Sequence, residues 1–174
     1  MEMERIALVT GSSRGIGRAI AKKLAAEGYR VCVNYRVRQD CALALAEELQ
    51  TAGHEAMAVG ADVSDPDAVN AMVRQIEDAW GPVSLLVNNA GISGQAQIQD
   101  VTPQDWRRYF AVNVDGAFYA AQAVLPPMLR LQNKPAVHAQ DLAGDEGGPV
   151  PGQEGHGPGD ILRGADAAQG RLLL

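Results

Sequence analysis

The chain has 174 residues, of which 47% are hydrophobic and 21% charged, with 15 Lys and Arg against 21 Asp and Glu and a formal net charge of -6. This length and composition predict one soluble globular domain, and an acidic balance without a basic run argues against a nucleic-acid partner. The charged start, the two cysteines and the absence of an apolar run long enough to cross a bilayer predict a cytoplasmic protein with no membrane span.

The first predicted element is a strand at residues 5–10, whose unbroken apolar run ends at Gly11 as expected for a buried strand. A helix follows and ends at Gly28, with apolar residues spaced by three and four along its predicted inward face: Ile16, Ala19, Ile20 and Leu24. Residues 31–34 form the second strand. The second helix ends at Gly53 and turns inward Ala42, Leu45, Ala46 and Leu49.

Residues 56–61 form the third predicted strand, and capping patterns mark the next two helices. Residues 64–67 supply a capping side chain, a proline and an acid three positions on, and the helix turns inward Val69, Met72, Val73, Ile76 and Trp80. A fourth strand covers 83–87. Residues 102–105 open a fourth helix in the same style, with the predicted inward face Trp106, Phe110, Val114, Ala117, Ala121 and Val124.

This alternation predicts an α/β fold, a Rossmann-like doubly wound parallel sheet of about four strands and four helices within residues 1–133. The composition changes at Lys134. Residues 134–174 hold nine of the 19 glycines and four of the nine prolines, and no aromatic residue. We expect this Gly/Pro-rich tail to be irregular and disordered.

A glycine-rich turn lies between the first strand and the first helix, with the spacing Gly-x-x-x-Gly-x-Gly. Gly11 permits a tight exit from the strand, Gly15 lets the backbone approach a pyrophosphate, and Gly17 allows close packing of the helix. The helix N-terminus presents N–H groups to an anion. The turn therefore predicts a dinucleotide site, with a ligand-free turn as the alternative. The predicted contacts are Gly11, Ser13, Arg14, Gly15, Ile16 and Gly17.

The end of the second strand indicates which dinucleotide is bound. An NAD site needs an acid there for the ribose 2′-hydroxyl, but this chain has Tyr35 and Arg36 after Asn34. Arg36, together with Arg14 of the glycine turn, suits a 2′-phosphate. The pattern favours NADP(H) over NAD(H), with Tyr35 and Arg36 among the contacts. The alternative is that Arg36 and Arg38 are only solvated surface side chains.

Two further polar features are the run after the fourth strand and an asparagine within the fourth helix. Residues 88–91, Asn-Asn-Ala-Gly, follow the fourth strand at the edge where open α/β sheets bind ligands, although a simple turn is the alternative. Asn113 is a polar, weak helix former inside a long apolar helix. It is either a satisfied structural amide or a functional residue.

With these motifs in this order, residues 4 to about 130 resemble the short-chain dehydrogenase/reductase family, especially its bacterial 3-oxoacyl-acyl-carrier-protein reductase-like members, which serve fatty acid biosynthesis. The resemblance implies that Asp62 and Val63 contact adenine and that Asn113 belongs to a catalytic Asn-Ser-Tyr-Lys set. It also implies that the run after the fourth strand lines the cofactor site, through Asn89, Ala90 and Gly91. The resemblance further implies an NAD(P)-dependent oxidoreductase that forms a homo-oligomer and acts on a carbonyl or acyl-thioester substrate.

The chain departs from that family in its second half. None of its tyrosines has a lysine four positions on, as the residues at those positions show: Val33, Gln39, Asn113 and Ala123. The catalytic Ser is missing as well. The general acid for a carbonyl oxygen, and the cation that lowers its pKa, are therefore absent. We expect an inactive cofactor-binding fragment whose C-terminal half is missing or frameshifted, and homo-oligomerisation is doubtful for it.

The missing second half of the family fold has two expected structural consequences. The fourth strand would become a bare edge of the sheet, and the fourth helix would expose Phe118 or its neighbours. The alternative function is a non-catalytic nucleotide-binding or subunit-partner protein, whereas a methyltransferase-like domain is disfavoured by the Asn-Asn-Ala-Gly run. No metal site is expected, because the histidines are scattered and the cysteines few. The sequence does not identify the substrate.

Overall fold

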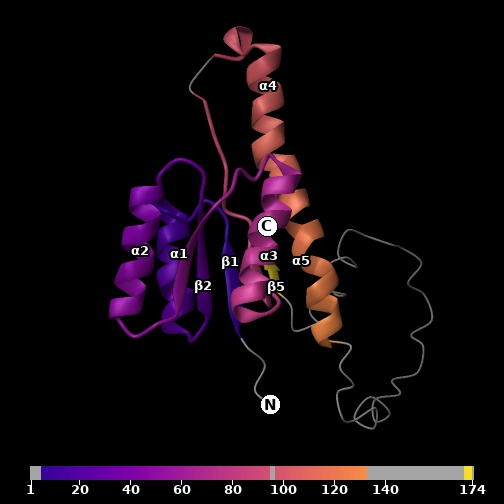
Figure 1. The fold of residues 1–174 in the computed structure, drawn as a ribbon. Helices are drawn as coiled ribbons and strands as arrows, with labels where there is room; N and C mark the ends of the chain where they lie inside the picture. Colours follow the sequence, from indigo (N-terminus) through magenta and orange to yellow (C-terminus); the bar gives the residue numbers. More distant parts are fainter. Residues whose placement is uncertain (1–4, 95–96, 133–170, 174) are drawn as a thin grey trace, which may run out of the picture.

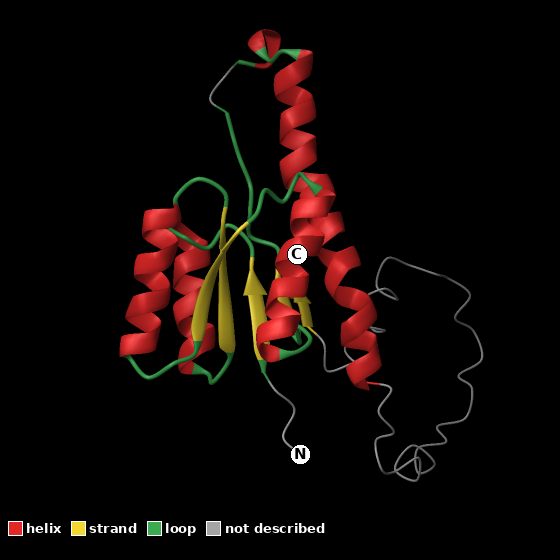
Figure 2. Ribbon diagram, viewed as in Figure 1, coloured by secondary structure: helices red, strands yellow, loops and turns green. Residues whose placement is uncertain are grey.

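A parallel sheet with helices on both faces forms the centre of the molecule (Figures 1 and 2). The computed structural model describes residues 5–94, 97–132 and 171–173. The strand order is β3-β2-β1-β4-β5, with all neighbouring pairs parallel. The strands are β1 (Ile6–Val9), β2 (Arg30–Tyr35), β3 (Ala56–Gly60), β4 (Leu85–Val87) and β5 (Arg171–Leu173). The predicted α/β class and doubly wound sheet are confirmed.

Helices α1 (Gly15–Ala26) and α2 (Gln39–Thr51) cover one face, and α3 (Pro66–Trp80) and α5 (Gly116–Gln132) cover the other (Figure 1). A 3₁₀ turn, η1 (Ile98–Asp100), precedes α4 (Pro103–Phe110). Helix α4 continues through a π-helical turn, η2 (Ala111–Asp115), into α5, and it stands above the sheet in Figure 1. No described helix is long and apolar enough to cross a membrane.

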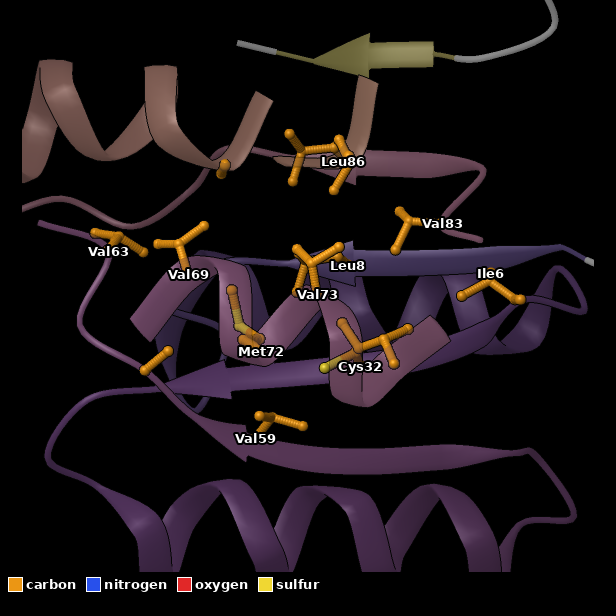
Figure 3. Packing of buried hydrophobic residues seen from close by; sticks show 14 of the residues in the cluster. Ile6, Leu8, Cys32, Val59, Val63, Val69, Met72, Val73, Val83 and Leu86 are labelled. Carbon is orange, nitrogen blue, oxygen red and sulfur yellow. The ribbon is translucent and has the colours of Figure 1, made fainter. Parts of the chain in front are cut away.

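The strands bury both faces, which explains their nearly continuous hydrophobicity. Alternate residues of β1 point to opposite sides: Leu8 packs in the cluster under α3 and α5, whereas Val9 packs in the cluster under α1 and α2. Figure 3 shows Val69, Met72 and Val73 of α3 lying over the sheet residues of the first cluster. The predicted inward residues of α2 and α3 are buried, except for Trp80, which is partly buried against the same cluster.

The predicted capping patterns form the expected hydrogen bonds. The Asp65 carboxylate caps α3 by accepting from the N–H groups of Asp67 and Ala68, so the capping residue is Asp65 rather than Ser64. Thr102 and Asp105 cap each other's backbone N–H at the start of α4, a complete capping box. The order and type of these elements therefore follow from local sequence.

The inward face of α1 differs from the prediction. Its buried residues are Gly17, Ala21 and Ala25, whereas Ile16 is 75% exposed. Small side chains let this helix lie close against the sheet, so the larger apolar residues lie on its flanks. Of the predicted stripe, Ile20 and Leu24 are partly buried against the cluster.

The predicted fourth helix is one rod with an irregular middle. No residue of α4 is buried, because this helix stands above the sheet (Figure 1). The prediction of an inward Trp106, Phe110 and Val114 is therefore wrong, since all three are exposed. The residues that face the core include a row spaced by four, of which Val124 was predicted to face inward: Val112, Gly116, Ala120, Val124 and Met128. The exposure of Phe118 is confirmed at 59%.

The expected bare edge of β4 is also wrong, whereas the count of about four strands within residues 1–133 is confirmed by β1 to β4. The backbone of β5 pairs with β4, in the register Leu85 to Arg171 and Val87 to Leu173. Unpaired N–H and C=O groups along an apolar edge favour pairing with another extended segment, and this part of the chain provides one. The rest of the predicted Gly/Pro-rich tail, 133–170 and 174, lies outside the described residues.

Candidate functional site

The predicted site residues gather at one edge of the sheet. The glycine turn follows β1, Tyr35 and Arg36 end or follow β2, Asp62 and Val63 follow β3, and residues 88–91 follow β4. Carboxyl ends of parallel strands share one edge, which is where open α/β sheets bind ligands. Asn113 joins them from the π-helical turn.

The glycines of the turn are required by its backbone and by its close neighbours. Gly11 has φ +63°, and a Cβ there would lie 2.8 Å from the Cα of Ala90. A Cβ on Gly17 would meet the side-chain amide of Asn89 and lie 2.8 Å from the Cα of Ser12. Gly15 has φ +59° with no atom within 4 Å of its Cβ position. The turn is therefore tightly packed on its inner side and open at Gly15.

Helix α1 begins without a side-chain cap and without an acidic residue in its first turn. Its N-cap residue is Arg14. In contrast, carboxylates lie at the starts of α3 and α4. The positive end of the α1 dipole thus has no carboxylate of its own beside it. Arg14 and Ile16 are exposed here, and Ser13 is buried.

The Thr10 hydroxyl connects the ends of β1 and β4. Its oxygen accepts hydrogen bonds from the N–H groups of Asn89 and Ala90, each at 3.0 Å, and it donates to the carbonyl of Val87. The Asn89 amide returns the contact by donating to the carbonyls of Thr10 (2.8 Å) and Gly11 (3.2 Å). These bonds fix the glycine turn against the run that follows β4.

Asn34 has a structural role that was not predicted from the sequence. It is buried, its Oδ1 accepts from the N–H of Gly11 at 3.0 Å, and its amide donates to the carbonyls of Val59 and Ala61. Its own carbonyl accepts from the N–H of Ser12. The available signal was a polar residue ending an apolar strand. The side chain of Asn34 in β2 therefore connects the glycine turn after β1 to the end of β3.

Arg36 and Asp62 form an ion pair between the loops after β2 and β3, with Arg36 Nη1 3.1 Å from Asp62 Oδ2. The other oxygen, Oδ1, accepts from the N–H and the hydroxyl of Ser64. Burial opposes ionisation of Asp62, but the bonds from Ser64 and Arg36 outweigh it and lower the pKa of this carboxyl. Arg38 pairs instead with Asp40, and both arginines are exposed side chains.

Tyr35 packs on the neighbouring strand, where a Cβ on Gly60 would lie 3.2 Å from its ring and its hydroxyl oxygen. Val63 is buried beneath the start of α5, since a Cβ on Gly116 would lie 2.8 Å from its Cγ2. The backbone positions of both residues are thereby fixed by packing.

Asn113 holds the loop after β4. Its Oδ1 accepts from the N–H of Ile92 at 2.8 Å, and its Nδ2 donates to the Ile92 carbonyl at 2.9 Å. The residue itself is exposed, so it is a satisfied amide but not a buried one. π-helical turns of this kind are frequent at functional sites.

A pocket of about 150 Å³ lies between the strand ends and the π-helical turn. A typical ligand site has a volume of about 300–1,000 Å³. This smaller pocket therefore suits one ring of a larger ligand. Its lining combines apolar and amide groups: Thr10, Val63, Asn88, Ala90, Val112, Asn113, Gly116 and Ala117. With the open turn at Gly15 and the cation at Arg36, the edge offers contacts for a ring, an anion and a second anion.

The chain is similar in sequence to known proteins. The family model described as short chain dehydrogenase matches residues 5–150, so the match extends beyond the motifs into the Gly/Pro-rich region. A Staphylococcus aureus protein, 3-oxoacyl-[acyl-carrier-protein] reductase FabG, is 39% identical over 149 residues, covering 86% of this chain and 61% of its own length. Versicolorin reductase of Emericella nidulans is 40% identical over 118 residues, 68% of this chain and 45% of that protein.

Solved structures agree in fold. A blue fluorescent protein from a metagenomic library, in complex with NADPH, matches with a TM-score of 0.67 and 41% identity, covering 70% of this chain and 50% of that one. A dehydrogenase/reductase from Sinorhizobium meliloti gives a TM-score of 0.69 and 38% identity, covering 71% and 49%. The chain thus spans 61% or less of the length of these relatives.

Proposed function

Because the chain belongs to the short-chain dehydrogenase/reductase family of oxidoreductases, we propose that it binds NADP(H) in preference to NAD(H) at the carboxyl edge of its sheet. The observation that carries the proposal is the glycine turn, closed on its inner side by Ala90 and Asn89 and open at Gly15. An open glycine beside an unprotected helix N-terminus fits a pyrophosphate.

The residues of the turn have separate tasks in this proposal. Gly15 and Ile16 present backbone N–H groups to the pyrophosphate, while Ser13 and Gly17 keep the turn in shape. Gly11 brings the turn against Ala90, and Asn89 fixes it through the hydrogen bonds described above. In this proposal the residues of the turn bind the cofactor and do not contact its reacting atoms.

The preference for the 2′-phosphate rests on charge. No acid stands at the end of β2, where Arg36 presents a guanidinium that is 47% exposed. Arg14, at the start of α1, adds a second cation on the same edge. Guanidinium groups bind phosphate through paired, charge-assisted hydrogen bonds. The NADPH complex of the metagenomic relative agrees with this preference.

In this proposal the adenosine end lies at the side of the pocket formed by Val63 and Ala90, and Asp62, Tyr35 and Gly91 are further proposed contacts of the cofactor. The family's reaction is reduction of a carbonyl, for which the bound nicotinamide supplies the hydride. In this chain Asn113 would hold the loop beside the reacting end through Ile92. A 3-oxoacyl thioester is the substrate class that the names of the bacterial relatives favour.

The chain as printed lacks a Tyr-x-x-x-Lys segment to protonate the carbonyl oxygen. We therefore expect cofactor binding without turnover. Titration calorimetry should show NADPH binding, tighter than NADH, while an assay with NADPH and an acetoacetyl thioester should show no oxidation of the cofactor. Failure to bind either dinucleotide would refute the site, and measurable reduction would refute the inactivity.

The same missing segment favours a second candidate, a non-catalytic nucleotide-binding or subunit-partner protein. Both candidates bind the cofactor, so binding alone does not separate them. Size-exclusion chromatography with and without NADPH does: a monodisperse, stable NADPH complex favours the second candidate, whereas aggregation in both conditions favours an inactive fragment.

A further inference from the structure

The ion pair between Arg36 and Asp62 connects two loops that the proposed function treats separately. Arg36 follows β2 and Asp62 follows β3, 26 positions apart in sequence. β2 and β3 are paired in parallel from Val31 and Ala56 up to Tyr35 and Gly60. The two side chains therefore meet because the sheet brings the strand ends together, directly at the proposed position of the 2′-phosphate.

Asp62 is held from its other side. Its Oδ1 accepts from the N–H of Ser64 at 3.0 Å and from the Ser64 hydroxyl at 2.7 Å, while Oδ2 faces Arg36. The two oxygens thus have different partners. A carboxylate fixed by two hydrogen bonds offers Arg36 a stationary counter-charge, and these bonds also keep it ionised by lowering its pKa.

Arg36 uses only part of its guanidinium in this contact. Nη1 donates to Asp62, whereas Nη2 and Nε make no hydrogen bond to a described residue. A free arginine side chain has many rotamers, and ordering it on binding costs free energy. A partner that fixes one nitrogen in advance reduces that cost and leaves the remaining donors for a phosphate.

We infer that Asp62 is a positioning residue for Arg36, and that the chain Ser64–Asp62–Arg36 sets the preference for a 2′-phosphate over a 2′-hydroxyl. This inference rests on the proposed dinucleotide site. Asp62 also repels the phosphate, but that repulsion acts between partly exposed charges, where water and salt weaken it. The fixed orientation of a planar donor is the larger effect.

The test is the ratio of the dissociation constants for NADH and NADPH, measured by calorimetry on the full chain. Arg36→Gln should lower this ratio about tenfold, because it removes a charge-assisted contact with the phosphate. Asp62→Asn should lower it about threefold to tenfold. The double variant should match Arg36→Gln alone, since Asp62 acts through Arg36. A contact of Asp62 with adenine affects both dinucleotides equally and cancels in the ratio.

Two further variants make the result decisive. Ser64→Ala keeps the Asp62 charge but removes the 2.7 Å hydroxyl bond, and should lower the ratio by a smaller factor. Asp40→Asn breaks the neighbouring Arg38–Asp40 pair, and should leave the ratio unchanged. If Asp62→Asn does not fold, Ser64→Ala decides the question.

Three outcomes would overturn the inference. Asp62→Asn could leave the ratio unchanged, it could raise the ratio because Asp62 competes with the phosphate, or it could lower the ratio equally in the Arg36→Gln background. In each case the wild-type chain still binds NADPH and the proposed function stands. Wild-type protein that binds neither dinucleotide would instead refute the proposed function, and the inference with it.

Discussion

Asn113 binds both backbone groups of Ile92, accepting from its N–H at 2.8 Å and donating to its carbonyl at 2.9 Å. A side-chain amide that matches a peptide group in this way acts like one rung of a sheet. It connects the π-helical turn to the loop after β4, and the Oδ1 atom also lies 3.5 Å from the Cβ position of Gly91. The direction of that loop therefore depends on Asn113.

Replacing Asn113 by Ala should release the loop. We expect faster hydrogen exchange at the Ile92 amide and a loss of about 1 kcal/mol in the free energy of unfolding, measured by mass spectrometry and urea denaturation. Asn113→Asp is the matched control, since it keeps the acceptor for the Ile92 N–H and should retain part of the protection. Unchanged exchange in Asn113→Ala would contradict this role.

Thr10→Val should destabilise the protein by about 1–3 kcal/mol, because the partly buried N–H groups of Asn89 and Ala90 lose their acceptor. Valine has nearly the same shape, so packing changes little. Thr10→Ser keeps the hydroxyl and should cost much less in the same urea titration. A smaller loss in Thr10→Val than in Thr10→Ser would show that the methyl group, not the oxygen, matters.

Gly17→Ala should cost about 1–3 kcal/mol by overpacking and should weaken NADPH binding, because the new methyl group displaces the Asn89 amide. Gly53→Ala is the comparison. Gly53 also resists substitution, at φ +87°, but it has open space around it and precedes β3 at the opposite edge of the sheet. That variant should lose stability and keep its affinity in calorimetry.

The Asp62 contacts predict a pH dependence of stability. The pKa of Asp62 is lower in the folded protein than its ordinary value of about 3.9. Its contribution is therefore complete above the ordinary value and is lost as the pH falls through the lowered one. The difference in unfolding free energy between wild type and Asp62→Asn should be largest near neutral pH and shrink on acidification below about pH 4. A difference that stays constant or grows would contradict the assignment.

Deleting residues 171–174 should leave β4 as an edge strand and promote association. Light scattering over a range of protein concentrations should show larger particles than for the full chain. Deletion of Leu174 alone keeps all three pairs between β4 and β5 and is the control. A monodisperse protein without residues 171–174 would show that β5 is dispensable for covering the edge.

Local patterns predicted most of the architecture, because their causes are local. Asp65 and Thr102 cap their helices through residues two or three positions away, and Gly53 reaches a positive φ that side chains disfavour. Such interactions lie within one window of sequence. The parallel sheet followed from buried strands alternating with capped helices.

The errors arose where distant segments decide the outcome. Trp106 and Phe110 are exposed because α4 stands above the sheet and buries none of its residues, which the apolar spacing did not reveal. The role of Asn34 depends on Gly11 and Ala61, which only the folded sheet brings beside it. The pairing of Arg36 with Asp62 has the same origin, as has the pairing of β5 with β4.

The wide turn at Ala111–Asp115 divides a single rod into two parts with different constraints. Downstream, substitutions at Ala120 or Val124 disturb the core directly, because both are buried. Upstream, no residue of α4 is buried, so substitutions on its exposed side chains should disturb the core less. The turn lets one continuous helix serve as a scaffold at one end and as an adaptable surface at the other.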